Sequence, residues 1–161
     1  MNNKVRLFEP ELIFCGIEVK DKVECLERMV SYLAENGILQ DKKAFLDVVL
    51  EREAIMSTGI GRNIALPHGR SYLVSTVRSV VFLLKEGIDF QAVDEQSVRF
   101  IVLTASPEKE SHIYMLMLKR LTEHLRQSQN REHLFAITDK QELIKIMKGI
   151  ENEVNKDLAD M

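Results

Sequence analysis

The sequence predicts a single-domain α/β or α+β fold. Two apolar runs, at 77–84 and 98–104, have the length and composition of strands that are buried on both faces. A third, shorter run lies at 64–66, and about five segments around these runs have the three-to-four-residue apolar period of helices. The 161 residues, of which 45% are hydrophobic, suffice for one domain with a well-filled core.

Composition and charge disfavour several classes of protein. The formal net charge is −3 and the isoelectric point is about 5.9, whereas nucleic-acid-binding domains are usually basic. No apolar run is long enough to span a membrane, and residues 1–10 lack the apolar stretch of a signal peptide. We therefore expect a cytoplasmic protein without membrane insertion. Cys15 and Cys25 have neither metal-site spacing nor a disulfide framework, and we expect buried free thiols.

The first third of the chain is expected to contain two helices. Leu7-Phe8 and residues 12–14 are apolar and should pack onto the domain. Residues 21–35 have apolar side chains at steps of three and four, after an aspartate that suits a helix start. Asp41 is the expected N-cap of a second helix, which runs to about Arg52.

Residues 51–70 form the stretch around which we expect the functional site. Gly59 and Gly61 allow positive φ angles and a close approach of the backbone to another group. Residues 64–66 suit a short buried strand, which the following proline ends because proline lacks the N–H that a ladder requires. His68 is therefore predicted at a strand end, where the scaffold meets solvent.

Arginines surround His68 in the sequence: Arg52, Arg62 and Arg70 share its stretch. Like charge disfavours a protonated imidazole, whereas the planar guanidinium matches phosphate oxygens. The residue types thus suggest a histidine that meets or carries phosphate; the alternative is a turn histidine with scattered surface arginines. For Arg52 the alternative is a cation that complements a helix C-terminus. Glu53 is expected to be solvated or paired with an arginine.

Downstream of a polar connection, the sequence predicts two neighbouring strands. Residues 77–84 form the first, and Lys85-Glu86-Gly87 form a turn that ends it. Residues 98–104 form the second strand. The segment between the two strands is polar and rich in turn-forming residues.

The C-terminal third is predicted to be helical. Ser106-Pro107 lead into a helix with His112 in its first turn, where free backbone N–H groups attract anions. Short helices at 129–137 and 141–150 close the domain. Residues 151–161 are expected to form a charged, frayed tail.

The sequence resembles the enzyme IIA components of the phosphoenolpyruvate-dependent phosphotransferase system. The branch is the fructose/mannitol type, which includes the nitrogen-regulatory IIA proteins. The matching residues are Arg52-Glu53, Ser57 to Gly61, Ile64 to Gly69, Gly87 to Asp94 and Ser111-His112. The resemblance covers about residues 8–148. It implies one IIA domain over residues 1–150, with a mixed, about five-stranded sheet flanked by helices on both sides, followed by the tail.

The resemblance also implies a phosphocarrier. His68 would accept a phosphoryl group on Nε2 from HPr or its nitrogen-branch equivalent, with Nδ1–H bonded to backbone. It would then pass the group to a IIB component of a sugar permease. Arg52 would bind the phosphoryl oxygens and His112 would donate a hydrogen bond to them. The residues expected to complete the phosphate cradle are Ser57, Thr58, Gly59 and Gly61. No metal or organic cofactor is implied, because the phosphohistidine itself carries the group.

One position departs from the family pattern. Relatives usually follow Gly-Ile-Gly with a small or polar residue and then glycine, whereas this chain has Arg62-Asn63. Asn63 tolerates the left-handed conformation, so the turn can persist. Arg62 adds a cation that would affect the choice of partner. Because His68, Arg52 and His112 are retained, we expect an active carrier.

Two further functions stay open at this point. Nitrogen-regulatory IIA proteins share these residues but control other proteins through their phosphorylation state; transfer of phosphate to a IIB protein separates the two roles. A metal-dependent hydrolase would use His68 and His112, although the sequence has no HxH, HExxH or cysteine pair to complete its site. A metal content near zero would eliminate that hydrolase.

Overall fold

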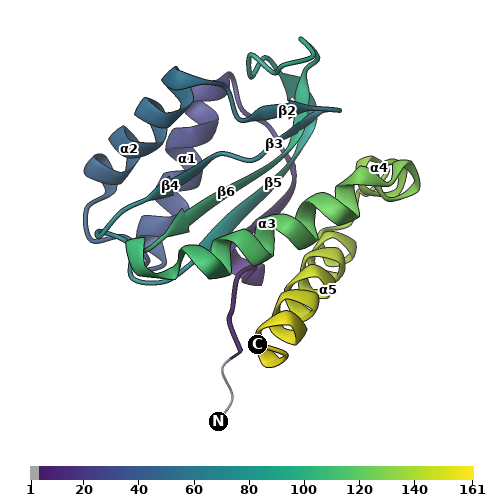
Figure 1. The fold of residues 1–161 in the computed structure, drawn as a ribbon. Helices are drawn as coiled ribbons and strands as arrows, with labels where there is room; N and C mark the ends of the chain where they lie inside the picture. The colour runs from purple at the N-terminus through teal and green to yellow at the C-terminus, as the bar shows by residue number, and fades with distance from the viewer. Residues whose placement is uncertain (1–3) are drawn as a thin grey trace.

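A mixed six-stranded sheet lies between two layers of helices (Figure 1). The computed structural model describes residues 4–161. The predicted fold class is confirmed, including the helices on both sides; the sheet has six strands where about five were expected. Residues 1–3 of the predicted domain lie outside the described residues. Within residues 4–161, no helix has both the length and the apolar character that crossing a membrane requires.

Strand order places the short strands at one edge. The strands are β1 (Ile13–Ile17), β2 (Gly59–Gly61), β3 (Ile64–Ala65), β4 (His68–Arg70), β5 (Arg78–Ile88) and β6 (Val98–Ser106). Their order in the sheet is β1-β5-β6-β3-β2. Strand β3 pairs with the first half of β6, and β4 pairs with its last three residues, Thr104 to Ser106. The β5–β6 and β2–β3 pairs are antiparallel, and the other pairs are parallel. The helices are α1 (Lys22–Glu35), α2 (Lys42–Ile55), α3 (Ser111–Arg126), α4 (Ser128–Phe135) and α5 (Lys140–Ala159), with 3-10 turns η1 (Pro10–Leu12) and η2 (Glu108–Glu110).

Each face of the sheet has its own apolar core, because successive side chains of a strand point to opposite faces. Helices α1 and α2 cover one face, and α3 and α5 cover the other (Figure 1). The first core includes Leu26, Phe45, Val80, Phe82 and Leu103, and the second includes Phe8, Val81, Leu83, Met117 and Leu143. Both cysteines are free: Cys25 is buried as expected, and Cys15 is only half-buried.

The first two helices begin where the sequence predicts. Asp21 accepts a hydrogen bond from the Glu24 N–H at 2.9 Å, and Asp41 accepts one from the Ala44 N–H at 3.0 Å. These side chains satisfy N–H groups that a first turn leaves without partners. Helix α2 continues to Ile55, slightly beyond the predicted end.

Strand β5 is longer than predicted, and the expected turn at 85–87 is wrong. The strand continues to Ile88, with a shift of register between Leu83 and Ile88. A Cβ on Gly87 would lie 2.4 Å from the Ser97 Oγ. Because Gly87 has no side chain, this polar segment can lie close to Ser97 of the same chain. The strand therefore continues through the shift of register instead of ending.

The expected frayed tail at 151–161 is wrong, because α5 continues through most of it. Val154 is fully buried, and Glu151 is almost fully buried. The Glu151 carboxylate accepts hydrogen bonds from the N–H groups of Leu7 (2.6 Å) and Phe8 (3.0 Å). The segment is charged in composition, but its Glu151 holds the backbone of Leu7 and Phe8, near the N-terminus, against the domain.

We expect Glu151→Ala to lower the free energy of unfolding by about 2 kcal/mol, because two buried N–H groups lose a charged acceptor. Asn152→Ala, at an exposed neighbouring position, is the matched control and should change stability by less than about 0.5 kcal/mol. Urea denaturation followed by circular dichroism measures both. Equal unfolding midpoints for the two variants would contradict this account of the C-terminal turns.

Candidate functional site

His68 lines a pocket of about 440 Å³ at the junction of β4, α2 and α3. Its lining residues are Val48, Arg52, His68, Gly69, Arg70, Ser106, Ser111, Tyr114 and Met115. These residues come from α2, β4, the end of β6 and the start of α3. Figure 1 shows β4 between α2 and the start of α3. Two of the lining residues are arginines, so the pocket is suited to an anion.

The chain re-enters the sheet at His68. Residue Ala65 ends β3, and after Leu66-Pro67 the chain pairs again with β6, where His68 lies beside Thr104. The Thr104 N–H donates to the Pro67 carbonyl at 3.0 Å, so proline joins the ladder through its oxygen although it lacks an N–H. His68 therefore begins a second short strand, instead of following the end of a strand as predicted.

Gly69 sets the distance between β4 and α2. A Cβ at this position would lie 2.9 Å from ring atoms of Phe45 and 3.2 Å from a methyl group of Val49. Because glycine leaves this space free, α2 packs directly on β4. Arg52 follows Val49 by about one helical turn, and the close packing therefore brings Arg52 to the His68 pocket.

The imidazole of His68 is held with one nitrogen facing the backbone. Nδ1 lies 3.4 Å from the Leu66 carbonyl oxygen, which accepts its proton in the Nδ1–H tautomer. Burial lowers the pKa of His68; the Leu66 carbonyl opposes this shift, and the Arg52 guanidinium adds to it. The ring is therefore neutral at neutral pH, with Nε2 free to act as a nucleophile.

We expect the pKa of His68 to lie below its usual value of 6.5, and Arg52→Gln to raise it by removing a nearby positive charge. Because folding lowers this pKa, the contribution of His68 to stability is present above pH 6.5 and is lost as the pH falls through the folded pKa. NMR titration of the ring protons measures both values. A His68 that titrates at or above 6.5 in the wild type would contradict the burial argument.

Arg52 forms a hydrogen bond at the C-terminal end of α2 and also lines the pocket. Its Nη1 donates to the Met56 carbonyl at 2.7 Å, at the C-terminus of α2, where carbonyl groups lack helical partners. This contact is the structural role considered as the alternative for Arg52. It is compatible with the predicted site role, since the same side chain lines the pocket and lowers the pKa of His68.

The other two arginines differ in position. Arg70 lines the pocket from β4 and is exposed. Arg62 does not line it and lies in the connection between β2 and β3. Arg62 and Asn63 have φ angles of 57° and 68°, the left-handed pair of a tight two-residue hairpin. The predicted persistence of this turn is confirmed.

The structure does not bring the four predicted cradle residues to the pocket. Those residues are Ser57, Thr58, Gly59 and Gly61. The Ser57 hydroxyl donates to the Phe90 carbonyl at 2.6 Å and accepts from the Gly59 N–H at 3.0 Å. The N–H and hydroxyl of Thr58 both donate to Glu53. Their polar groups thus hold the hairpin in place, and a direct role in phosphate binding stays a prediction.

Glu53 is buried, and the expectation that it is solvated or paired with an arginine is wrong. Its partner is Lys22, whose Nζ lies 3.0 Å from Oε2. Only 5% of the Glu53 side chain and 14% of the Lys22 side chain are exposed. This ion pair joins α1 to the last turn of α2, the turn that also carries Arg52.

Helix α3 contributes different residues from those predicted. His112 is exposed and does not line the pocket, whereas Ser111, Tyr114 and Met115 do. These three share a helix face at spacings of three and four. The ring centroids of Tyr114 and His68 are 5.3 Å apart. The role of His112 stays a prediction, and Tyr114 was not recognised from the sequence.

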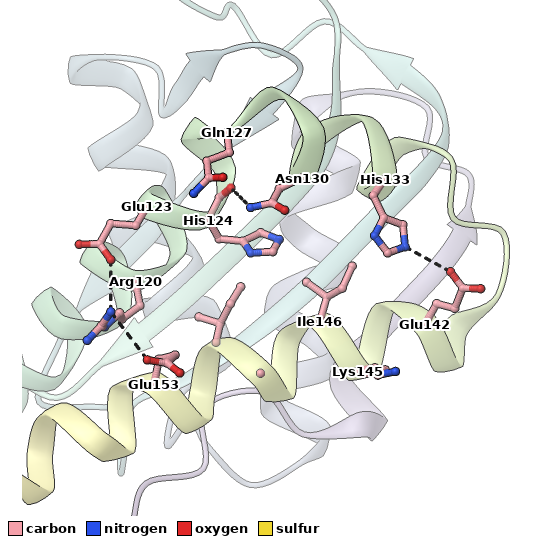
Figure 2. A pocket seen from close by; sticks show the side chains of 12 residues that line it. Arg120, Glu123, His124, Gln127, Asn130, His133, Glu142, Lys145, Ile146 and Glu153 are labelled. Atoms are coloured by element: carbon pink, nitrogen blue, oxygen red, sulfur yellow. Dashed lines mark hydrogen bonds and ion pairs between the residues drawn. The ribbon is translucent and has the colours of Figure 1, made fainter.

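A larger hollow, of about 730 Å³, lies between α3–α4 and α5 (Figure 2). Its charged groups are mostly engaged with one another: Arg120 pairs with Glu123 and Glu153, and His133 lies 3.6 Å from Glu142. His124 projects between the helices, and burial lowers its pKa. Since the Arg120 guanidinium already has carboxylate partners, we place the candidate functional site at His68.

The family of the chain follows from its comparison with known proteins. Residues 6–150 match the family described as "Phosphoenolpyruvate-dependent sugar phosphotransferase system, EIIA 2". The chain belongs to this family. The resemblance seen in the sequence is thereby confirmed, and the chain is an EIIA-type phosphocarrier of the phosphotransferase class.

Three similar proteins show the range of the family. The fructose-specific EIIABC component of Bacillus subtilis is 29% identical over 88% of this chain, which spans only 22% of that relative. The crystal structure of nitrogen regulatory protein IIA-Ntr from Neisseria meningitidis is 25% identical, covers 88% of this chain and 96% of its own, and has a TM-score of 0.81. The complex of enzyme IIAMTL and phosphorylated enzyme IIBMTL from Escherichia coli contains the same fold, at 23% identity, coverage of 89% and 99%, and a TM-score of 0.75.

The metal-dependent hydrolase considered from the sequence gains no support. It requires His68 and His112 in one site, and His112 does not line the pocket of His68. The family match instead agrees with phosphoryl transfer.

Proposed function

We propose that His68 accepts a phosphoryl group on Nε2 from the phosphohistidine of HPr or a nitrogen-branch HPr-like carrier, and passes it to a IIB component. The observation that carries this proposal is the state of the His68 ring. The ring is neutral, its Nδ1 faces the Leu66 carbonyl, and its Nε2 is left for a pocket that also contains Arg52 and Arg70.

The transfer needs little beyond positioning and charge. The Nε2 lone pair attacks phosphorus, the bond from phosphorus to the donor nitrogen breaks, and its electron pair returns to the donor imidazole. Nδ1 keeps its proton, and its hydrogen bond to Leu66 stabilises the positive charge that the ring gains. Arg52 and Arg70 line the pocket and supply guanidinium groups for the phosphoryl oxygens.

Apolar side chains near the pocket support a protein partner. Ile55 and Met56 follow Arg52 at the end of α2 and are 81% and 63% exposed, and Met115 on the pocket wall is 58% exposed. Exposed apolar groups that gather around a functional pocket are typical of docking surfaces. A carrier protein that docks there would bring its own phosphohistidine to His68.

The identity of the acceptor separates two functions. The E. coli complex joins an enzyme IIA to a phosphorylated enzyme IIB, which supports a IIB acceptor here. The likeness to nitrogen regulatory protein IIA-Ntr over nearly its whole length supports the second candidate, a regulator that binds a target protein according to its phosphorylation state. A cytoplasmic location stays a prediction from the sequence.

Phosphorylation in a purified system tests the proposal. The wild type and His68→Ala are incubated with radiolabelled phosphoenolpyruvate, enzyme I and HPr, and a purified IIB protein is then added. We expect acid-labile label on the wild type alone, which leaves it when IIB is present. Label that stays on the chain would favour the regulatory role. Equal labelling of His68→Ala would contradict the assignment of the carrier residue.

A further inference from the structure

Tyr114 is the aromatic neighbour of His68 in the pocket. The two ring centroids are 5.3 Å apart, and the ring planes are inclined by 38°. The tyrosine lines the pocket from the first turn of α3, whereas Arg52 lines it from α2. Tyr114 therefore shares with His68 the pocket that a phosphoryl group on the imidazole would enter.

The phenol is suited to donating a hydrogen bond. Burial raises the pKa of Tyr114, and the Arg52 guanidinium partly opposes this shift. The hydroxyl therefore stays protonated at neutral pH. The guanidinium of Arg52 acts on both Tyr114 and His68, which places the three side chains around one space.

We propose that Tyr114 is the residue by which α3 holds the phosphoryl group on His68. Its ring packs against the imidazole, and its hydroxyl donates a hydrogen bond to a phosphoryl oxygen. This inference rests on the proposed function and gives α3 a donor in addition to His112, whose role stays a prediction.

Helix geometry places Tyr114, and not His112, beside the His68 ring. Positions two apart on an α-helix point about 200° from each other, so His112 and Tyr114 face different directions. In the structure Tyr114 faces the pocket and His112 is exposed to solvent. Ser111 and Met115 lie beside Tyr114 on the pocket face, which fixes the orientation of the helix.

Tyr114→Phe tests the hydroxyl, because it keeps the ring. We expect it to slow phosphoryl uptake from phospho-HPr about tenfold and to shorten the half-life of phosphorylated His68, since one hydrogen bond to a charged group is lost. Tyr114→Leu also removes the ring and should in addition move the pKa of His68 toward its usual value. Tyr72→Phe, at an exposed tyrosine outside the pocket, is the matched control and should behave as the wild type.

The outcomes separate this inference from the proposed function. Wild-type uptake and half-life in Tyr114→Phe, with normal labelling of His68 in the wild type, would overturn the role of Tyr114 alone. Slowed uptake in His112→Asn together with normal uptake in Tyr114→Phe would leave His112 as the donor on α3 and overturn the role of Tyr114. A wild type that takes up no label would overturn the proposed function, and the role of Tyr114 with it.

Discussion

Glu53→Ala is expected to lower the free energy of unfolding by about 3 to 5 kcal/mol. The substitution leaves the largely buried Lys22 ammonium without its carboxylate partner at 3.0 Å, with the uncharged Phe90 carbonyl and Gln91 side chain as acceptors. A buried charge that loses its counter-ion is strongly destabilising. The substitution also removes the acceptor of the Thr58 N–H and hydroxyl, which hold the segment that leads into β2. Denaturation in urea, monitored by circular dichroism, measures the change.

The exposed pair of Lys43 and Asp47 on α2 provides the control. Its atoms are 3.7 Å apart, and Asp47→Ala should change stability by less than about 0.5 kcal/mol. The double variant Lys22→Met/Glu53→Leu removes both charges and should be more stable than Glu53→Ala alone. If Glu53→Ala and Asp47→Ala unfold at the same denaturant concentration, the ion pair does not have the structural role described here.

Arg52→Gln is expected to slow phosphoryl uptake by His68 about 100-fold. The guanidinium is the cation that α2 places at the pocket, and removal of one preorganised donor to a developing anion typically has an effect of about this size. Arg52→Lys keeps the charge but loses the planar fork, so we expect an intermediate rate. Quench-flow measurement of transfer from phospho-HPr gives the rates.

Arg62→Gln is the matched control for this prediction. Arg62 is exposed, lies in the β2–β3 hairpin and does not line the pocket. Its uptake rate should stay within about threefold of the wild type, because exposed charges act only weakly at a distance. Similar losses in Arg52→Gln and Arg62→Gln would show a general effect of positive charge instead of a specific contact at the pocket.

The parts of the fold that were predicted correctly depend on local signals. Asp21 and Asp41 cap their helices as their positions indicated, and the apolar runs became β5 and β6. The errors have non-local causes. Residues 85–87 stay in β5 because Ser97 lies close to Gly87, and the turns after residue 150 stay helical because Glu151 binds the N-terminal backbone.

The same distinction holds for the site. His68 and Arg52 belong to one short motif, so the sequence could place both at the pocket. Tyr114 approaches from a helix more than 40 residues later, and only the packing of α3 on the sheet decides that it, and not His112, faces His68. Ser57 and Thr58 lie inside the motif, but their hydrogen bonds are directed to Phe90 and Glu53.

The nitrogen of His68 that carries the phosphoryl group provides the most direct test of the central claim. A long-range proton–nitrogen correlation spectrum of the ¹⁵N-labelled chain, recorded before and after phosphorylation by phospho-HPr, identifies it. We predict a proton on Nδ1 in both states and coupling to phosphorus at Nε2 after phosphorylation, because the Leu66 carbonyl holds Nδ1. Phosphorus coupling at Nδ1, or at the ring of another histidine, would contradict the account.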